Sequence, residues 1–311
     1  MPSENPTTYV LITPARNEAK FIEMTIRSVV AQTVRPLKWV IVSDGSTDDT
    51  DAIVQRYASE HAWIELLRMP PKQERDFVGK VRAFNAGYAR VSGLQFKAVG
   101  SLDADISFDS DYFAFLLQKL DQDRKLGLVG TPFQEESGQT YDYRFVNIEH
   151  VSGACQLFRR ECFTEIGGYV PVKGGSIDHI AVILARMRGW KTRTFTEKLC
   201  LHHRQLGTAQ EKVLRARFNY GVKDYRIGNH PAWQVLRTFY QMTQKPFVVG
   251  GVALAVGYCW ASICRHQRPV SKEFMSFHRR EQMLRIKSLF LRNKTTSVSH
   301  NHQETAPQIP A

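Results

Sequence analysis

Two aspartates separated by one small residue close an apolar segment of the chain. Residues 97–106 read KAVGSLDADI, so Asp103 and Asp105 directly follow a run that is typical of a buried strand. In an open α/β sheet, ligands bind at the carboxyl ends of the strands, where paired carboxylates can hold a divalent cation against a phosphate. Asp-x-Asp is also common in ordinary turns, so the pair alone leaves both interpretations open.

Further apolar segments indicate the elements that would position this pair. Four of them are predicted strands: residues 9–13, 39–42, 63–67 and 97–102. Stretches with helical spacing of apolar residues lie between them, at 21–33, after 47 and at 81–91. The second strand also runs into an acid, Asp44, and Ser46 or Thr47 is expected to cap the helix that follows. Strands that alternate with helices predict βαβ units and a mostly parallel sheet flanked by helices, an α/β fold.

Four motifs, in this order, resemble the inverting family 2 glycosyltransferases of the GT-A fold: ITPARNE, VSDGSTDDT, GKVRAFNAGY, and LDAD with the later GGY…GGSID. The resemblance covers roughly residues 9–208. It implies a GT-A catalytic domain that binds a nucleotide sugar donor, with Mn²⁺ or Mg²⁺ as cofactor.

The resemblance also implies which residues meet the nucleotide: Pro14, Ala15, Asn17, Glu18, Asp44, Lys80 and Asn85. Asp44 would accept a hydrogen bond from uracil or ribose, because an ionised carboxylate only accepts. The alternative is that the acids of this loop cap the next helix, and we expect that of Asp48 and Asp49. Lys80 meets a phosphate or is simply solvated.

For the metal, the resemblance implies Asp105 as a direct ligand, with Asp103 at the ribose or coordinating through water. His202 and His203, in LHHRQLGT, occupy the place where many GT-A enzymes present a histidine to the metal or the diphosphate. Arg204 would pair with a phosphate. A structural role for the histidines stays open, as does which ring reaches the metal.

Asp178 matches the family's catalytic base. The family usually has Glu-Asp here, whereas this chain has Ile177-Asp178, so a carboxylate that commonly assists is missing. His179 is expected to be a neighbour of the base, and Glu165, the other acid considered, to lie on the surface. No Gln-x-x-Arg-Trp motif of the processive synthases follows Asp178. We therefore expect one sugar to be transferred per encounter.

Charge and cysteine content limit the kinds of partner and ligand that the chain is expected to bind. The 311-residue chain has a formal net charge of +12, and residues 265–294 hold nine Lys or Arg against two Glu. A basic segment beside an apolar one favours an anionic membrane surface over nucleic acid. The five cysteines lack the spacing of a zinc site or a disulfide framework. Residues 1–10 lack a secretory signal pattern, so we expect the catalytic part at the cytoplasmic face of the cell membrane.

The apolar segment is residues 246–264, which carry no charged side chain. It is close to the roughly 20 residues that a membrane-spanning helix needs. It could span, re-enter, lie on the membrane or pack on the domain, while residues 274–291 are a predicted basic surface helix. The expected domains are a GT-A catalytic domain at 1–230 (nucleotide-binding half 9–106, acceptor half 107–210), a helical membrane-associated segment at 231–291 and a disordered tail at 292–311.

Together these features predict metal-dependent, inverting transfer of one sugar, with UDP as the expected nucleotide, to a lipid-linked or polysaccharide acceptor. The closest alternative is a polyprenyl-phosphate glycosyltransferase, which needs no base because its acceptor is already ionised. A nucleotidyltransferase would have a glycine-rich loop after the first strand, and TPARNEAK has no glycine. A non-catalytic nucleotide-sugar-binding membrane adaptor is the alternative outside enzymes. The oligomeric state stays open.

Overall fold

The structure is a computed structural model that describes residues 8–70, 77–135, 148–172, 175–204 and 210–299. Parts of the loops expected at 68–79 and 172–177, the end of the motif region at 205–208 and the tail from residue 300 lie outside these residues. The chain divides into two compact units, residues 1–207 and 208–311.

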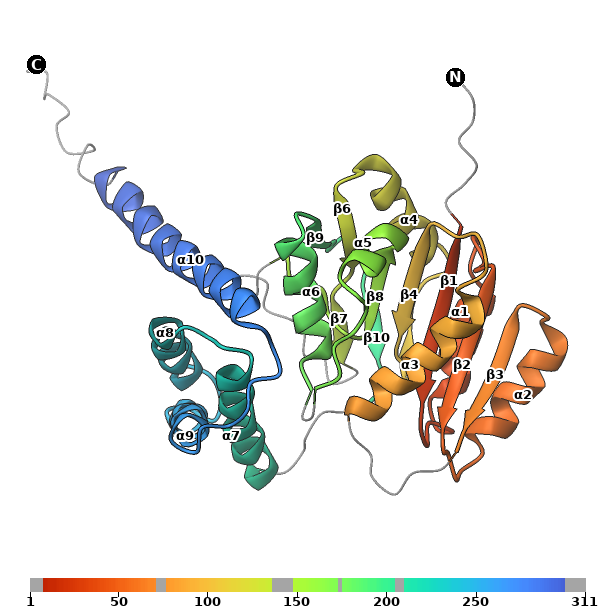
Figure 1. The fold of residues 1–311 in the computed structure, drawn as a ribbon, viewed down its shortest axis with the longest axis horizontal. Coiled ribbons are helices and arrows are strands. Elements are labelled where there is room, and N and C mark those ends of the chain that lie inside the picture. Colours follow the sequence, from red (N-terminus) through yellow and green to blue (C-terminus); the bar gives the residue numbers. More distant parts are fainter. Residues whose placement is uncertain (1–7, 71–76, 136–147, 173–174, 205–209, 300–311) are drawn as a thin grey trace, which may run out of the picture. The chain divides into compact units, whose positions relative to one another are not determined.

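A seven-stranded sheet, in the order β3-β2-β1-β4-β8-β6-β9, forms the centre of the first unit (Figure 1). Its strands are β1 (Tyr9–Ala15), β2 (Lys38–Asp44), β3 (Ile64–Met69), β4 (Ala98–Leu102), β6 (Leu126–Gly130), β8 (Cys155–Arg159) and β9 (Lys191–Thr194). The first four strands are parallel, and β8 runs antiparallel to both of its neighbours. The mostly parallel α/β sheet expected from the sequence is therefore confirmed.

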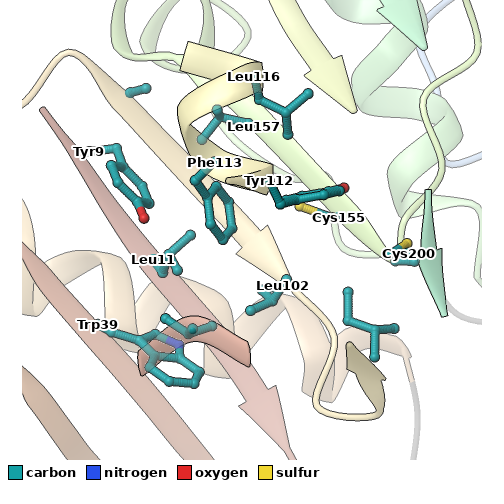
Figure 2. Packing of buried hydrophobic residues seen from close by; sticks show 14 of the residues in the cluster. Tyr9, Leu11, Trp39, Leu102, Tyr112, Phe113, Leu116, Cys155, Leu157 and Cys200 are labelled. Atoms are coloured by element: carbon teal, nitrogen blue, oxygen red, sulfur yellow. The ribbon is translucent and has the colours of Figure 1, made fainter. Parts of the chain in front are cut away.

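Helices cover both faces of this sheet. They are α1 (Ile22–Val30), α2 (Thr50–Glu60), α3 (Phe77–Val91), α4 (Tyr112–Gln122), α5 (Arg160–Glu165) and α6 (Ile177–Met187). Successive residues of a strand point to opposite faces, and both faces of β1 are apolar. Figure 2 shows Tyr9 and Leu11 on the face that carries Phe113 of α4, and the rings of Tyr9 and Phe113 stack at 5.0 Å. The other face of β1 packs against α3, where Gly87 leaves room for Ile12. A strand buried on both sides explains why its sequence is a continuous apolar run.

The start of α2 differs from the expectation. The helix begins at Thr50, so neither Ser46 nor Thr47 caps it, and Asp48 and Asp49 precede its first turn. The Asp48 carboxylate instead accepts a hydrogen bond from the Thr50 amide at 3.1 Å. A carboxylate two residues before an amide can close such a turn as readily as a cap, and the sequence pattern does not distinguish the two.

A second, three-stranded sheet was not predicted. It consists of β5 (Ile106–Ser107), β10 (Cys200–His202) and β7 (Phe133–Glu135), in that order. β10 runs antiparallel to β5 with His202 opposite Ile106, and parallel to β7. This small sheet brings residues near position 203 next to Asp105, which lies almost 100 positions earlier in the chain.

The second unit is helical, with α7 (Gln210–Arg226), α8 (Pro231–Met242), α9 (Val249–Ile263) and α10 (Lys272–Ser299). It begins earlier than the expected domain boundary at residue 230, because α7 packs tightly against α9. α10 runs on to Ser299, so residues 292–299 are helical where a disordered tail was expected; no proline or glycine interrupts the sequence from 272 to 299. Within the described residues, none of the helices has both the length and the apolar character needed to cross a bilayer.

Candidate active site

The carboxyl ends of the parallel strands β1, β2 and β4 bring acids to one edge of the sheet. Ala15 is paired with Ser43, the neighbour of Asp44, and Ile12 is paired with Ser101 of β4. Asp44 is only 8% exposed, and its Oδ1 atom has no hydrogen-bond partner among the described residues. A buried carboxylate oxygen is stabilised by a donor, so Asp44 can accept a hydrogen bond from a ligand at this edge.

The loop after β1 is fixed to the segment after β2 by two residues that were expected to meet the nucleotide, Asn17 and Glu18. Asn17 has a φ of 54°, a conformation that asparagine tolerates better than most residues. Its Oδ1 atom accepts a hydrogen bond from the Thr47 amide at 2.8 Å. The amide of Glu18 donates to the Thr50 hydroxyl at 2.8 Å. Pro14, which is half-buried, belongs to β1. The side chain of Asn17 thus holds the two loops together in this structure.

Asp103 pairs with Lys80, which reaches it from α3. The Lys80 Nζ and Asp103 Oδ1 atoms are 2.5 Å apart, and both side chains are about one-quarter exposed, at 27% and 25%. Burial alone would lower the pKa of Lys80, but the carboxylates of Asp103, Asp178 and Asp105 outweigh it and hold that pKa above its ordinary value. Burial, helped by the like charge of Asp105 and opposed by Lys80, raises the pKa of Asp103. Lys80 is therefore not simply solvated, because it is paired with Asp103.

Asp105 pairs with Arg204 in a second ion pair. Arg204 Nε donates to Asp105 Oδ2 at 2.9 Å, and its terminal nitrogen contacts the carboxylate of the buried Glu18. One guanidinium therefore joins the loop after β1 to the loop after β4. The sequence predicted Glu18 at the nucleotide and Arg204 at a phosphate, but did not predict that the two residues meet.

Of the two candidate histidines, His202 faces Asp105. Its Nδ1 atom is 2.9 Å from the carbonyl oxygen of Arg204, which can only accept, so Nδ1 carries the proton. In the neutral ring Nε2 is then an acceptor, and it lies 3.6 Å from Asp105 Oδ1. His203 points elsewhere, because its Nε2 atom lies 2.9 Å from the Ser107 hydroxyl.

A divalent cation fits the donor chemistry at Asp105. Two acceptor atoms that face each other, a carboxylate oxygen and an imidazole nitrogen, are suited to a cation between them. In the described part of the chain no three His, Cys, Asp or Glu side chains are grouped closely enough to hold a metal by themselves. Mg²⁺ is commonly held by one or two carboxylates together with water and substrate phosphates, so a complete protein cage is not required.

Asp178 lies in the first turn of α6, directly after two residues with positive φ and Ile177. Gly175 and Ser176 have φ values of 99° and 72°, and a positive φ is unusual for serine and is often found at functional sites. The Asp178 side chain packs on Gly153: a Cβ atom at that position would be 3.0 Å from Asp178 Oδ2. The next residue, Ala154, accepts a hydrogen bond from the Asp103 amide at 2.9 Å. Asp178 and the acid pair are therefore brought together, although 73 residues separate Asp105 from Asp178 in the sequence.

Two residues that the sequence analysis did not assign to the site support Asp178. Gln156 of β8 donates to the Asp178 carbonyl oxygen at 3.3 Å, and its Oε1 atom accepts from the Tyr169 hydroxyl at 2.7 Å. Both side chains are buried, and burial, with Asp178 and Asp103 contributing, raises the pKa of Tyr169 well above its ordinary value. The tyrosine of the GGY turn was visible in the sequence, but nothing in its spacing indicated this partner.

The remaining candidates lie at the margin of the site. Asn85 is exposed on α3. His179 follows Asp178 in α6 and turns to His150, with their Nδ1 atoms 3.3 Å apart. Glu165 is exposed and accepts a hydrogen bond from Trp190 Nε1 at 2.7 Å, so it lies on the surface.

A mostly parallel sheet with acids and basic partners at its carboxyl edge defines an α/β protein of the nucleotide-binding type. The model of the family described as "Glycosyl transferase family 2" matches residues 10–169, more than half of the chain. The chain belongs to this family.

Similar proteins agree with this assignment. A probable glycosyltransferase of Bacillus subtilis, YdaM, is 30% identical over 152 residues, or 48% of this chain and 34% of that protein. A dolichyl-phosphate beta-glucosyltransferase of Trichomonas vaginalis, ALG5C, is 35% identical over 127 residues, or 38% of this chain and 35% of that protein. The matches thus span about a third of these relatives.

Among solved structures, the fold resembles the mannosyltransferase PcManGT from Pyrobaculum calidifontis in complex with GDP-Man and Mn²⁺. The TM-score is 0.59 at 17% identity, with 91% of this chain and 88% of that chain covered. TarS of S. aureus in complex with UDP-GlcNAc gives a TM-score of 0.53 at 12% identity, with 88% of this chain and 78% of that chain covered. These neighbours share the GT-A fold with this chain, which confirms the fold class.

Proposed function

We propose that this chain is an inverting glycosyltransferase that moves one sugar from a nucleotide diphosphate sugar, with UDP as the expected nucleotide, to a lipid-linked or polysaccharide acceptor. The observation that carries the proposal is the packing of Asp178 on Gly153, next to the segment that binds the Asp103 amide. A carboxylate from a distant helix is thereby placed beside the acid pair. Membership of glycosyl transferase family 2 supports the reaction class.

The donor would lie at the carboxyl edge of the sheet. Asp44, with its unpartnered buried oxygen, is suited to accept a hydrogen bond from the base or the ribose. Lys80 and Arg204 each pair with one member of the acid pair, and each can turn from a carboxylate to a diphosphate oxygen. Both nucleotide sugars named with the structural neighbours, GDP-Man and UDP-GlcNAc, are diphosphate donors.

Asp105 and His202 would hold a divalent cation, with Asp103 beside them. When bound, Mn²⁺ or Mg²⁺ supplies positive charge against the diphosphate that leaves. The structural neighbour PcManGT was solved with Mn²⁺, which supports a divalent ion. The chain itself would contribute the positive charges of Arg204 and Lys80, which can also stabilise the leaving diphosphate.

Asp178 would act as the general base. Its carboxylate takes the proton of an acceptor hydroxyl as the acceptor oxygen bonds to the anomeric carbon of the sugar. The bond between that carbon and the diphosphate oxygen breaks, and its electron pair leaves with the nucleoside diphosphate. Gln156 positions the base by donating to the Asp178 carbonyl oxygen, and Tyr169 holds Gln156 in place. Attack opposite to the leaving group inverts the anomeric centre.

The test replaces the base without changing its shape. Asp178→Asn should lower Mn²⁺-dependent hydrolysis of a UDP-sugar, in which water replaces the acceptor, by about 100-fold to 10,000-fold. UDP binding measured by calorimetry should be unchanged, and Glu165→Gln, a surface acid, should keep full activity. Full hydrolysis by Asp178→Asn would remove the assigned base.

A polyprenyl-phosphate acceptor is the second candidate, because a relative with 35% identity is named a dolichyl-phosphate beta-glucosyltransferase. A lipid phosphate is already ionised, so transfer to it would survive Asp178→Asn while hydrolysis by water would not. A non-catalytic adaptor would bind UDP with Mn²⁺ and hydrolyse no UDP-sugar. For a lipid-linked acceptor we place the enzyme at the cytoplasmic face of the cell membrane, where the basic C-terminal segment can meet anionic lipid.

A further inference from the structure

Helix α9 buries its small residues and exposes its large apolar ones, the reverse of a typical helix at the surface of a water-soluble protein. Its buried side consists mostly of glycine and alanine: Gly250, Gly251, Leu254, Gly257 and Ala261. Its large apolar residues instead form what we call the outer stripe: Val249, Val252, Val256, Trp260 and Ile263, which are 53%, 44%, 52%, 53% and 78% exposed. These positions recur every three or four residues, so they lie on one face of the helix. A helix in contact with water normally buries such residues and exposes polar ones.

The glycine side of α9 is used for very close helix contact. A Cβ atom at Gly257 would lie 2.0 Å from the Phe218 carbonyl oxygen of α7. In the other direction, a Cβ atom at Gly221 of α7 would lie 2.0 Å from the Leu254 carbonyl oxygen. Backbones that touch through small residues are typical of helices whose large residues face lipid. The outer stripe is therefore not a surface that could be buried by turning the helix, because the glycine side must face α7.

The charge of the second unit indicates what covers the stripe. Residues 208–311 carry 16 Lys and Arg against five Asp and Glu, a net charge of +11 out of +12 for the whole chain. The first unit is thus nearly neutral, at +1. Exposed Lys245 and Arg265 flank the uncharged segment 246–264 directly. A partner with an apolar interior and an anionic surface matches both features, and a leaflet of anionic phospholipid has both.

We propose that the outer stripe of α9 is a membrane-docking surface that lies in the interfacial region of an anionic leaflet. The helix has 15 residues and rises about 22 Å, less than the roughly 30 Å of a bilayer core. It therefore lies along the leaflet, with Trp260 and Ile263 among the acyl chains and basic side chains at the headgroups. This inference rests on the membrane association in the proposed function and names the surface that provides it. It is independent of sugar transfer.

The experiment measures binding of the full chain to vesicles of phosphatidylcholine and phosphatidylglycerol at 3:1, by flotation. We expect the wild type to float with these vesicles and not with pure phosphatidylcholine. Trp260→Ser with Ile263→Ser should lower the partition coefficient at least about tenfold. The matched control, Met24→Ser with Leu37→Ser, changes two apolar residues of similar exposure in the first unit, 45% and 46%, and should bind as the wild type does. All four side chains are at least 45% exposed, so both variants should fold, which circular dichroism verifies.

The exposed Cys259 of α9 gives a second measurement. Its reaction with a membrane-impermeant maleimide should slow when anionic vesicles are added. The proposal is overturned if the stripe variant floats as well as the wild type, or if neither protein floats. It is also overturned if the stripe instead joins two copies, seen as a dimer in light scattering that the stripe variant loses. UDP-sugar hydrolysis in lipid-free buffer separates the two proposals, because loss of docking leaves it intact and loss of the proposed enzyme activity leaves flotation intact.

Discussion

Arg204 is paired with Asp105, which predicts competition between this arginine and a divalent cation for the carboxylate. Its Nε atom lies 2.9 Å from Asp105 Oδ2, and its other end contacts Glu18. A cation that binds Asp105 must therefore displace the guanidinium or share the carboxylate with it. Arg204→Met removes the charge and keeps an unbranched side chain of similar reach. We expect this variant to bind Mn²⁺ more tightly than the wild type and to transfer sugar more slowly.

The magnitude follows from the exposure of the pair. Arg204 is 33% exposed, so each of its two carboxylate contacts falls near the range of partly solvated ion pairs, about 0.5–1 kcal/mol. In the wild type, Mn²⁺ binding must break both contacts, which costs about 1–2 kcal/mol of binding free energy. Without that cost, Arg204→Met should bind Mn²⁺ about 5-fold to 30-fold more tightly. Arg204→Lys keeps the charge but lacks the planar guanidinium with its paired donors. Its Mn²⁺ affinity should lie between those of the wild type and Arg204→Met.

The assay is titration of the nucleotide-free protein with Mn²⁺, with free Mn²⁺ followed by electron paramagnetic resonance. The matched control is Arg90→Met, because Arg90 makes a similar 2.7 Å pair with Glu65 far from the acids of the site. It removes the same charge from the chain and should leave the Mn²⁺ affinity unchanged. Weaker or equal Mn²⁺ binding by Arg204→Met would refute the competition and would indicate that Arg204 only supports the geometry of Asp105.

Two further predictions test the base and the fold. Gly153→Ala places a Cβ atom 3.0 Å from Asp178 Oδ2, so the carboxylate must move by a few tenths of an ångström. Because a 1 Å misplacement of a catalytic group can cost about 100-fold in rate, kcat should fall about threefold to tenfold while KM for the donor stays unchanged. The control Gly93→Ala, whose Cβ meets nothing within 4 Å, should not change kcat. Native-state alkylation should label two cysteines, Cys259 and Cys264, and spare the three buried ones. Burial raises the pKa of two of these buried thiols to about 12, so raising the pH to 9 should not add a third label; a third label would show that the core opens.

The central half of the fold could be predicted because its strands are buried on both faces. β1, β2 and β4 are apolar without alternation, and each ends where a polar group begins, so type and boundary are both visible in the sequence. Parallel pairing then forces their carboxyl ends to one edge, which is why Asp44 and Asp103 could be expected together. The predicted cap of α2 at Ser46 or Thr47 was wrong because a local turn at Asp48 competes with a helix cap. Turns and caps favour the same residue types, so the sequence does not distinguish them.

The ion pairs of the site could not be predicted, because they join residues far apart in the chain. Arg204 and Glu18 are 186 positions apart, and Lys80 and Asp103 come from a helix and a strand end. Each basic residue is by itself an ordinary surface or phosphate-binding candidate. Only the packing shows that both basic side chains are paired with carboxylates.

The choice between His202 and His203 depends on the register of a three-residue strand. β10 pairs with β5 so that His202 is opposite Ile106, the residue after Asp105. His202 is the last residue of β10 and its Nε2 atom lies 3.6 Å from Asp105 Oδ1, whereas His203 follows the strand and its Nε2 atom lies 2.9 Å from the Ser107 hydroxyl. A slip of one residue in this pairing would move His202 away from its place opposite Ile106. Strands of two and three residues have too few positions to show a period in the sequence. The motif LHHRQLGT therefore indicates that histidine and arginine side chains are available, but not which of the two histidines faces Asp105. The small sheet therefore determines the candidate metal site, although it contributes few residues to the core.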